Sequence, residues 1–215
     1  RQHADKPAWT RWSVPQPDKG SHNLLQLTAD WRRYFAPTKN LTIGVRTIHY
    51  GRYGLSPEES TSDGFGMLRP LFLGYETFIR GYAYESFSAS ECSPPGSNSG
   101  GSCMAFNRLQ GQQLAVANLE LRIPLVGVEQ YGLINFQFVP VELVAFADAG
   151  LAWDSDNPPV LAFSRSGYER VPVFSTGISA RFNVLGFLIL EAYYAYPWQR
   201  PQKSWHWGFN IAPGW

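Results

Sequence analysis

Apolar and polar residues alternate with a period of two in several separate segments, each roughly 10 to 13 residues long. Such alternation places successive side chains on opposite faces of a β-strand. The segment SWHWGFNIAPGW shows it most clearly, because its odd positions are mostly aromatic or aliphatic and its even positions are small or polar. Trp207, Phe209 and Trp215 therefore share one face of a predicted strand, and Gly208 lies on the other.

Seven segments show this pattern and predict seven strands. They span residues 24–35, 40–50, 113–125, 141–153, 173–184, 186–198 and 204–215. A tilted strand of about 9 to 11 residues crosses a bilayer. Long and short connections mostly alternate along the chain, as in outer-membrane barrels, and residues 55–112 form the longest one. The connection 126–140 is longer than a turn, and we expect strand extensions within it.

A soluble β-sandwich is the alternative, because its strands also alternate but bury their apolar face. Here the apolar faces are rich in Ala, Tyr and Trp, and the polar faces carry isolated charges among glycines. We therefore predict an all-β fold, an antiparallel transmembrane β-barrel. Seven strands are an odd number, and an open sheet in lipid leaves two rows of backbone groups unpaired. Because the chain also begins at Arg1, we expect residues 1–215 to be a fragment, the C-terminal part of a larger barrel.

Composition argues against several functions. The formal net charge is +1, so we expect no nucleic-acid partner. Charged residues make up only 16%, below the usual roughly 25%, which favours contact with an apolar environment. The four histidines are scattered, and no metal-hydrolase, phosphate-binding or nucleophile motif is present. We therefore expect no metal, no cofactor and no catalytic residue, and hence no enzyme activity.

The only cysteines, Cys92 and Cys103, bracket the Gly/Ser/Pro-rich stretch ECSPPGSNSGGSC. Such a composition packs no core and predicts an exposed loop. A disulfide between the two cysteines would indicate an oxidising compartment. Two free thiols are the less favoured reading, and zinc binding is weaker still because no further Cys or His lies at ligand spacing.

Just ahead of this loop, the stretch FIRGY places Arg80 between apolar residues and Gly81. Glu120 and Asp148 lie on the polar faces of neighbouring predicted strands. A guanidinium pairs with carboxylates through a rigid fork of donors, so a loop that folds into the barrel would let Arg80 bridge both acids. Gly81 would then permit an unusual backbone angle or a close approach. The simpler alternatives are that Arg80 is a loop arginine without a partner, and that Glu120 and Asp148 only keep the interior of the barrel hydrated.

Several motifs, taken together, resemble the C-terminal half of the Omp85 superfamily. They are IRGY, NLELRIP, FADAG and GISARFN, followed by GFLILEAYYAYPW, and the match covers nearly all of residues 22–215. The superfamily includes the BamA/TamA-like assembly factors and the two-partner secretion transporters. The resemblance implies a sixteen-stranded barrel of the bacterial surface antigen type, in which these seven strands are the tenth to the sixteenth. Residues 55–112 would be its sixth extracellular loop.

The resemblance also implies roles for particular residues. The loop motif of the family is an aliphatic residue, Arg, Gly and an aromatic residue, matched here by Ile79, Arg80, Gly81 and Tyr82. Its arginine is held by an acid on the twelfth strand and by the aspartate of a Phe-x-Asp-x-Gly pattern on the thirteenth. The matching residues are Glu120, and Phe146, Asp148 and Gly150. The cysteine pair and the sequence around FIRGY also resemble a propeller-fused branch of the family.

The function implied by the resemblance is assembly or translocation of client proteins in the outer membrane of a Gram-negative-type bacterium. The closing strand, 204–215, would pair weakly with the first strand, and a client strand would add at the parted seam. Gly208, Pro213 and Gly214 fit a weak seam. Expected partners are outer-membrane lipids, client outer-membrane proteins and periplasmic accessory proteins. The alternatives are a passive porin, a surface adhesin, or the membrane anchor of an N-terminal enzyme domain.

Overall fold

The computed structural model describes residues 12–14, 22–53, 69–92, 103–127, 132–135, 139–163, 169–184, 187–202 and 204–213. All seven predicted strands are present. They are β2 (His22–Thr38), β3 (Leu41–Tyr53), β6 (Gln113–Gly127), β8 (Val141–Trp153), β9 (Val173–Val184), β10 (Leu188–Pro197) and β11 (His206–Pro213). No helix in the described residues is long and apolar enough to span a membrane.

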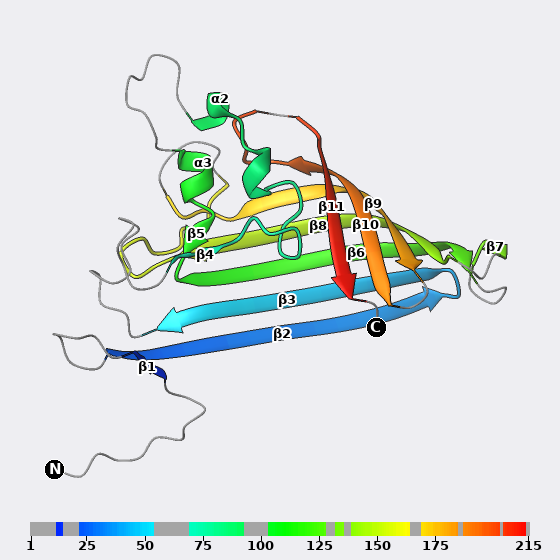
Figure 1. Ribbon diagram of the computed structural model, residues 1–215, viewed down its shortest axis with the longest axis horizontal. Coiled ribbons are helices and arrows are strands. Elements are labelled where there is room, and N and C mark those ends of the chain that lie inside the picture. The colour runs from blue at the N-terminus through cyan, green and yellow to red at the C-terminus, as the bar shows by residue number, and fades with distance from the viewer. Residues whose placement is uncertain are drawn as a thin grey trace, which may run out of the picture.

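These seven strands form one sheet in chain order, and every neighbouring pair is antiparallel. The short β1 (Trp12–Val14) pairs with β2. β6 continues to Gly127 and pairs there with the short β7 (Ile134–Asn135), which confirms the strand extension expected within 126–140. Within the described residues the sheet does not close. Figure 1 shows it strongly curled, with β10 and β11 steeply inclined to β2 and β3.

The connections alternate between the two ends of the sheet. The links from β3, β8 and β10 to the next long strand leave one end, and the links from β2, β6 and β9 leave the other (Figure 1). The described parts of the link before β6 contain β4 (Leu71–Phe72), a 3-10 turn at Tyr84–Ser86, α2 (Ala89–Cys92), α3 (Met104–Asn107) and β5 (Gln110–Gly111). We call the described residues 69–92 and 103–112 the motif loop. The face of the sheet that it contacts is the inner face.

The two faces of the sheet are inverted relative to a soluble protein. Polar side chains of the inner face are buried, among them Asn118, Glu120, Asp148, Ser175, Ser179 and Glu191. Apolar side chains of the outer face are exposed, among them Leu119, Leu143, Ile178, Trp207, Phe209 and Ile211. A soluble sandwich would bury the second set and expose the first. The arrangement is that of a transmembrane barrel, whose apolar band faces lipid.

An apolar core lies between the motif loop and the inner face rather than between two sheets. Leu73, Ile79 and Leu109 of the loop are fully buried. They pack against strand residues that include Leu114, Val116 and Ala152. The loop is therefore packed against the wall of the barrel, although its composition offered no periodic pattern.

Candidate functional site

Arg80 lies at the centre of the inner face and is 3% exposed. Its Nε and Nη2 donate to the two carboxylate oxygens of Asp148 on β8, each at 2.8 Å. The backbone N–H of Arg80 donates to the same carboxylate at 3.2 Å. This is the two-point geometry that a guanidinium can offer and an ammonium cannot. Asp148 is therefore the main partner of the motif arginine.

Two further carboxylates reach the same guanidinium from other strands. Nη1 of Arg80 donates to Oε1 of Glu191 on β10 at 2.9 Å. Nη2 lies 3.1 Å from Oε1 of Glu120 on β6. The sequence predicted Glu120 and Asp148 as partners of Arg80 but did not single out Glu191. Arg80 thus joins three strands, β6, β8 and β10, through one side chain.

Two more arginines complete the arginine–carboxylate cluster, which consists of Arg80, Arg122, Arg181, Glu120, Asp148 and Glu191. Arg181 on β9 pairs with Glu120 and with Glu191, at 2.5 Å and 3.1 Å. Arg122 pairs with Glu120 at 2.7 Å. The cluster has three cations and three anions, so its formal charge is balanced. A balanced, hydrogen-bonded set is the condition under which charges tolerate burial.

Burial by itself would lower the pKa of the Arg80 guanidinium. The neighbouring carboxylates of Asp148, Glu191 and Glu120 outweigh that effect and raise the pKa above its ordinary value. The arginine is therefore charged in its buried position.

Phe146, Asp148 and Gly150 show why the FADAG pattern suits this site, because all three face inward from β8. The guanidinium carbon of Arg80 lies 3.6 Å from the centre of the Phe146 ring, in cation–π contact. Asp148 pairs with the same guanidinium. A Cβ on Gly150 would lie 2.1 Å from Cδ1 of Ile79. Gly150 therefore leaves the space that the aliphatic residue of the loop motif fills.

The other residues of the loop motif are also fixed. Gly81 has φ of 86°, in the left-handed region, and a Cβ there would lie 3.1 Å from Cβ of Ala195. Tyr82 is 2% exposed, and its hydroxyl donates to the backbone oxygen of Phe174 on β9 at 3.0 Å. The glycine thus meets both of the expectations drawn from the sequence, an unusual backbone angle and a close approach.

Side chains of the wall also hold backbone carbonyls just ahead of the motif. Arg46 on β3 donates to the Thr77 carbonyl at 2.9 Å, while its other donors pair with Asp30 on β2. Asn118 on β6 donates to the Phe78 carbonyl and to Asp148, each at 2.8 Å. The spacing of these residues in the sequence gave no sign of these contacts, because their partners are backbone atoms of a distant loop.

The remaining predicted residues lie at the edges of the described structure. Cys92 and Cys103 are joined by a disulfide, and Cys103 is buried, although its surroundings in the sequence predicted an exposed loop. Trp207 and Phe209 are exposed on the outer face of β11, and Trp215 lies outside the described residues. Within the described residues no group of three His, Cys, Asp or Glu side chains is arranged to hold a metal ion.

Gly208 leaves space for an aromatic side chain of the neighbouring strand. A Cβ at this position would lie 2.1 Å from the ring and hydroxyl of Tyr193 on β10, the residue paired with it across the strands. The glycine therefore seats a buried aromatic ring between β10 and β11. Gly208 supports the contact of β11 with β10, whereas the expected seam lies at the other edge of β11 and stays a prediction.

An exposed apolar outer face, a buried charged inner face and a loop docked against that inner face define a transmembrane β-barrel protein with an occupied interior. The family model described as the Omp85 superfamily domain matches residues 10–214. The chain belongs to the Omp85 superfamily and is an outer-membrane β-barrel of that family. Members of the family work with bacterial outer-membrane proteins and lipids. No curated protein and no solved structure matches the chain significantly.

Asp148→Asn is expected to destabilise the barrel by about 2 kcal/mol, because it removes one buried charge and keeps one acceptor oxygen for Arg80. Arg80 retains Glu191 and Glu120, so its charge is not left alone. The measurement is urea unfolding of the full-length protein in lipid vesicles. Asp156→Asn, in an exposed position of the β8–β9 connection, is the matched control. Equal midpoints for Asp148→Asn and the unsubstituted protein would contradict this prediction.

Proposed function

We propose that this chain is the barrel of a protein assembly or translocation factor in the outer membrane of a Gram-negative-type bacterium. Client outer-membrane proteins add their strands at a lateral seam next to β11, and periplasmic accessory proteins assist. Residues 55–112 form an extracellular loop that is plugged into the barrel by Arg80. The role is one of binding and guidance, without catalysis.

The observation that carries this proposal is the contact of Arg80 with carboxylates from three strands. A passive pore needs an open interior, whereas here a loop occupies the interior and is joined to the wall by charge-assisted hydrogen bonds. Side chains from β3 and β6 hold further points of the same loop, and the loop residue Tyr82 donates to a backbone carbonyl of β9. A wall braced in this way confines movement to the part of the barrel outside the cluster.

β11 is the strand best placed to move. Unlike β6, β8, β9 and β10, it has no residue in the arginine–carboxylate cluster. A strand edge that parts from its neighbour offers a row of backbone donors and acceptors to which an incoming strand can add. The outer face of β11 carries Trp207, Phe209 and Ile211, all strongly exposed, so a client strand added there would continue an apolar, lipid-facing surface.

The test uses the full-length protein reconstituted in lipid vesicles. An unfolded client outer-membrane protein is added, and its folded fraction is measured by protease resistance. We expect faster client folding than in empty vesicles, and slower folding with the Arg80→Ala variant. Equal rates in vesicles with and without the protein would refute the proposal.

Single-channel recording separates the alternatives. A plugged assembly factor gives small, flickering currents, whereas a porin gives large and steady ones. Large steady currents together with no effect on client folding would favour a passive porin. Silence in both assays would favour an adhesin or the anchor of an enzyme domain.

A further inference from the structure

Arg200, in the connection between β10 and β11, is fully buried and has no part in the cluster around Arg80. It is 0% exposed. All five of its N–H groups have partners: Glu91 accepts from Nε at 2.9 Å and from Nη2 at 2.6 Å, and the remaining donors reach Gly81 and Ser86. Its guanidinium carbon also lies 4.2 Å from the centre of the Phe87 ring. Such complete satisfaction is expected of an arginine that fixes geometry.

The partners of Arg200 all belong to the motif loop. The Gly81 carbonyl accepts from Nη1 at 3.0 Å, so Arg200 holds the residue that follows the motif arginine. Ser88 and Gln202 add a second contact between the loop and the same connection, at 3.2 Å. The chain runs directly from this connection into β11, which begins at His206.

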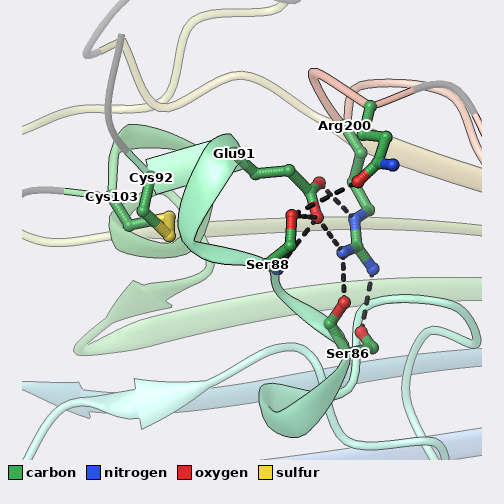
Figure 2. Close-up of a disulfide and its surroundings, with 7 residues drawn as sticks. Ser86, Ser88, Glu91, Cys92, Cys103 and Arg200 are labelled. Carbon is green, nitrogen blue, oxygen red and sulfur yellow. Dashed lines mark hydrogen bonds and ion pairs between the residues drawn. A yellow bond between two sulfur atoms is a disulfide. The ribbon is translucent and has the colours of Figure 1, made fainter.

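The disulfide lies beside the acidic partner. Glu91 is the last residue before Cys92, which is bonded to Cys103 (Figure 2). The bond joins the last residue of α2 to the residue before α3, and so fixes the short helix that presents Glu91 to Arg200. Burial by itself would raise the pKa of the Glu91 carboxyl, but hydrogen bonds from Arg200 and Ser88 lower it below its usual value. The pair is therefore ionic at neutral pH.

We propose that Arg200 and Glu91 form a latch that fastens the beginning of the closing strand to the motif loop, and that the disulfide holds the acidic half of this latch in place. Arg200 acts as a positioning residue for β11. The latch sets how readily the first residues of β11 separate from β10, while the cluster around Arg80 keeps the rest of the wall fixed. Its bearing on client insertion rests on the function proposed above, whereas its effect on β11 does not.

Hydrogen exchange of the full-length protein in detergent, read by mass spectrometry, tests the latch. In Arg200→Gln we expect exchange of the amides at the start of β11 to accelerate at least about tenfold, because a buried carboxylate loses its partner. Glu91→Gln should produce the same change. Exchange in β6 and β8 should stay as in the unsubstituted protein. Arg200→Lys keeps the charge but not the forked geometry of the guanidinium. Its exchange rate at the start of β11 should lie between those of the unsubstituted protein and of Arg200→Gln.

Arg170→Gln is the matched control. Arg170 also joins two connections at this end of the sheet, since it pairs with Asp154 at 3.2 Å and donates to the Asn107 carbonyl of the motif loop. Its connection leads into β9 rather than β11, so this variant should leave β11 unchanged. Equal acceleration of β11 in Arg170→Gln would show general loosening of the loops and would overturn the proposal.

The role of the disulfide is tested by combination. The variant Cys92→Ser/Cys103→Ser should accelerate exchange at the start of β11, and adding it to Glu91→Gln should cause little further change, because both act on one contact. Full additivity, or unchanged β11 in all of these variants, would overturn the latch. If Arg200→Gln does not fold, Glu91→Gln and the serine variant decide the question. Failure of the unsubstituted protein to fold clients would refute the proposed function and leave these measurements intact.

Discussion

Arg80→Ala is expected to lower the free energy of unfolding of the barrel by about 3 to 5 kcal/mol, the usual effect of leaving a buried charge without its partner. Three carboxylates face the space that the guanidinium fills. Glu120 and Glu191 would still pair with Arg181, but Asp148 would lose its bidentate cation. The loop would at the same time lose its charged contact with the wall. The measurements are urea unfolding of the full-length protein in vesicles and the heat resistance of its folded band on gels.

The balanced charge of the cluster supplies the controls for Arg80→Ala. Arg33→Ala removes an exposed arginine of β2 and should have little effect. Glu191→Gln added to Arg80→Ala restores equal numbers of cations and anions in the cluster. The double variant should therefore lose less free energy of unfolding than the sum of the two single variants. An Arg80→Ala protein with normal stability and normal client folding would show that the guanidinium does not brace the barrel.

Gly177→Val is expected to destabilise the barrel by about 3 kcal/mol, through overpacking at a position that the sequence did not single out. A Cβ at Gly177 would lie 2.2 Å from the backbone oxygen of Tyr194 on β10 and 2.7 Å from Cζ of Phe146. The first contact involves backbone, so relief requires a shift of β9 against β10. The second moves the ring on which the Arg80 guanidinium lies.

Gly127→Ala is the control for this prediction, since the nearest atom to its new Cβ is 3.9 Å away. The same unfolding experiment applies, and the intrinsic fluorescence of the aromatic residues reports movement of the packed rings. We expect Gly127→Ala to unfold like the unsubstituted protein. A Gly177→Val protein that also does so would mean that the β9–β10 contact accommodates a side chain without strain.

The strands were predictable because alternation is a local signal that survives without any knowledge of contacts. The direction of the faces was also predictable, since isolated charges such as Glu120 and Asp148 recur on one face only. Arg80 and Asp148 were found together because each belongs to a recognisable motif. In the structure each of the motif residues Phe146, Asp148 and Gly150 contacts or accommodates the loop.

What sequence reasoning missed depends on contacts between distant segments. Glu191 lies 111 residues from Arg80, and Arg200 lies 109 residues from Glu91, so no spacing rule connects them. The contact of Gly208 with Tyr193 was also missed, because the aromatic ring across from the glycine is known only once the strands are paired. The motif loop was unpredictable for a similar reason, since its order comes from packing on the wall rather than from a period of its own.

The segregation of side chains between the two faces has a consequence for the chain before it folds. The mean hydropathy of the sequence is −0.23, so the extended polypeptide is no more hydrophobic than that of an ordinary water-soluble protein. Only pairing of the strands gathers Leu119, Ile178 and Phe209 onto a common surface. The unfolded chain can therefore pass through an aqueous compartment before it reaches the membrane. Its affinity for lipid arises only when the sheet forms.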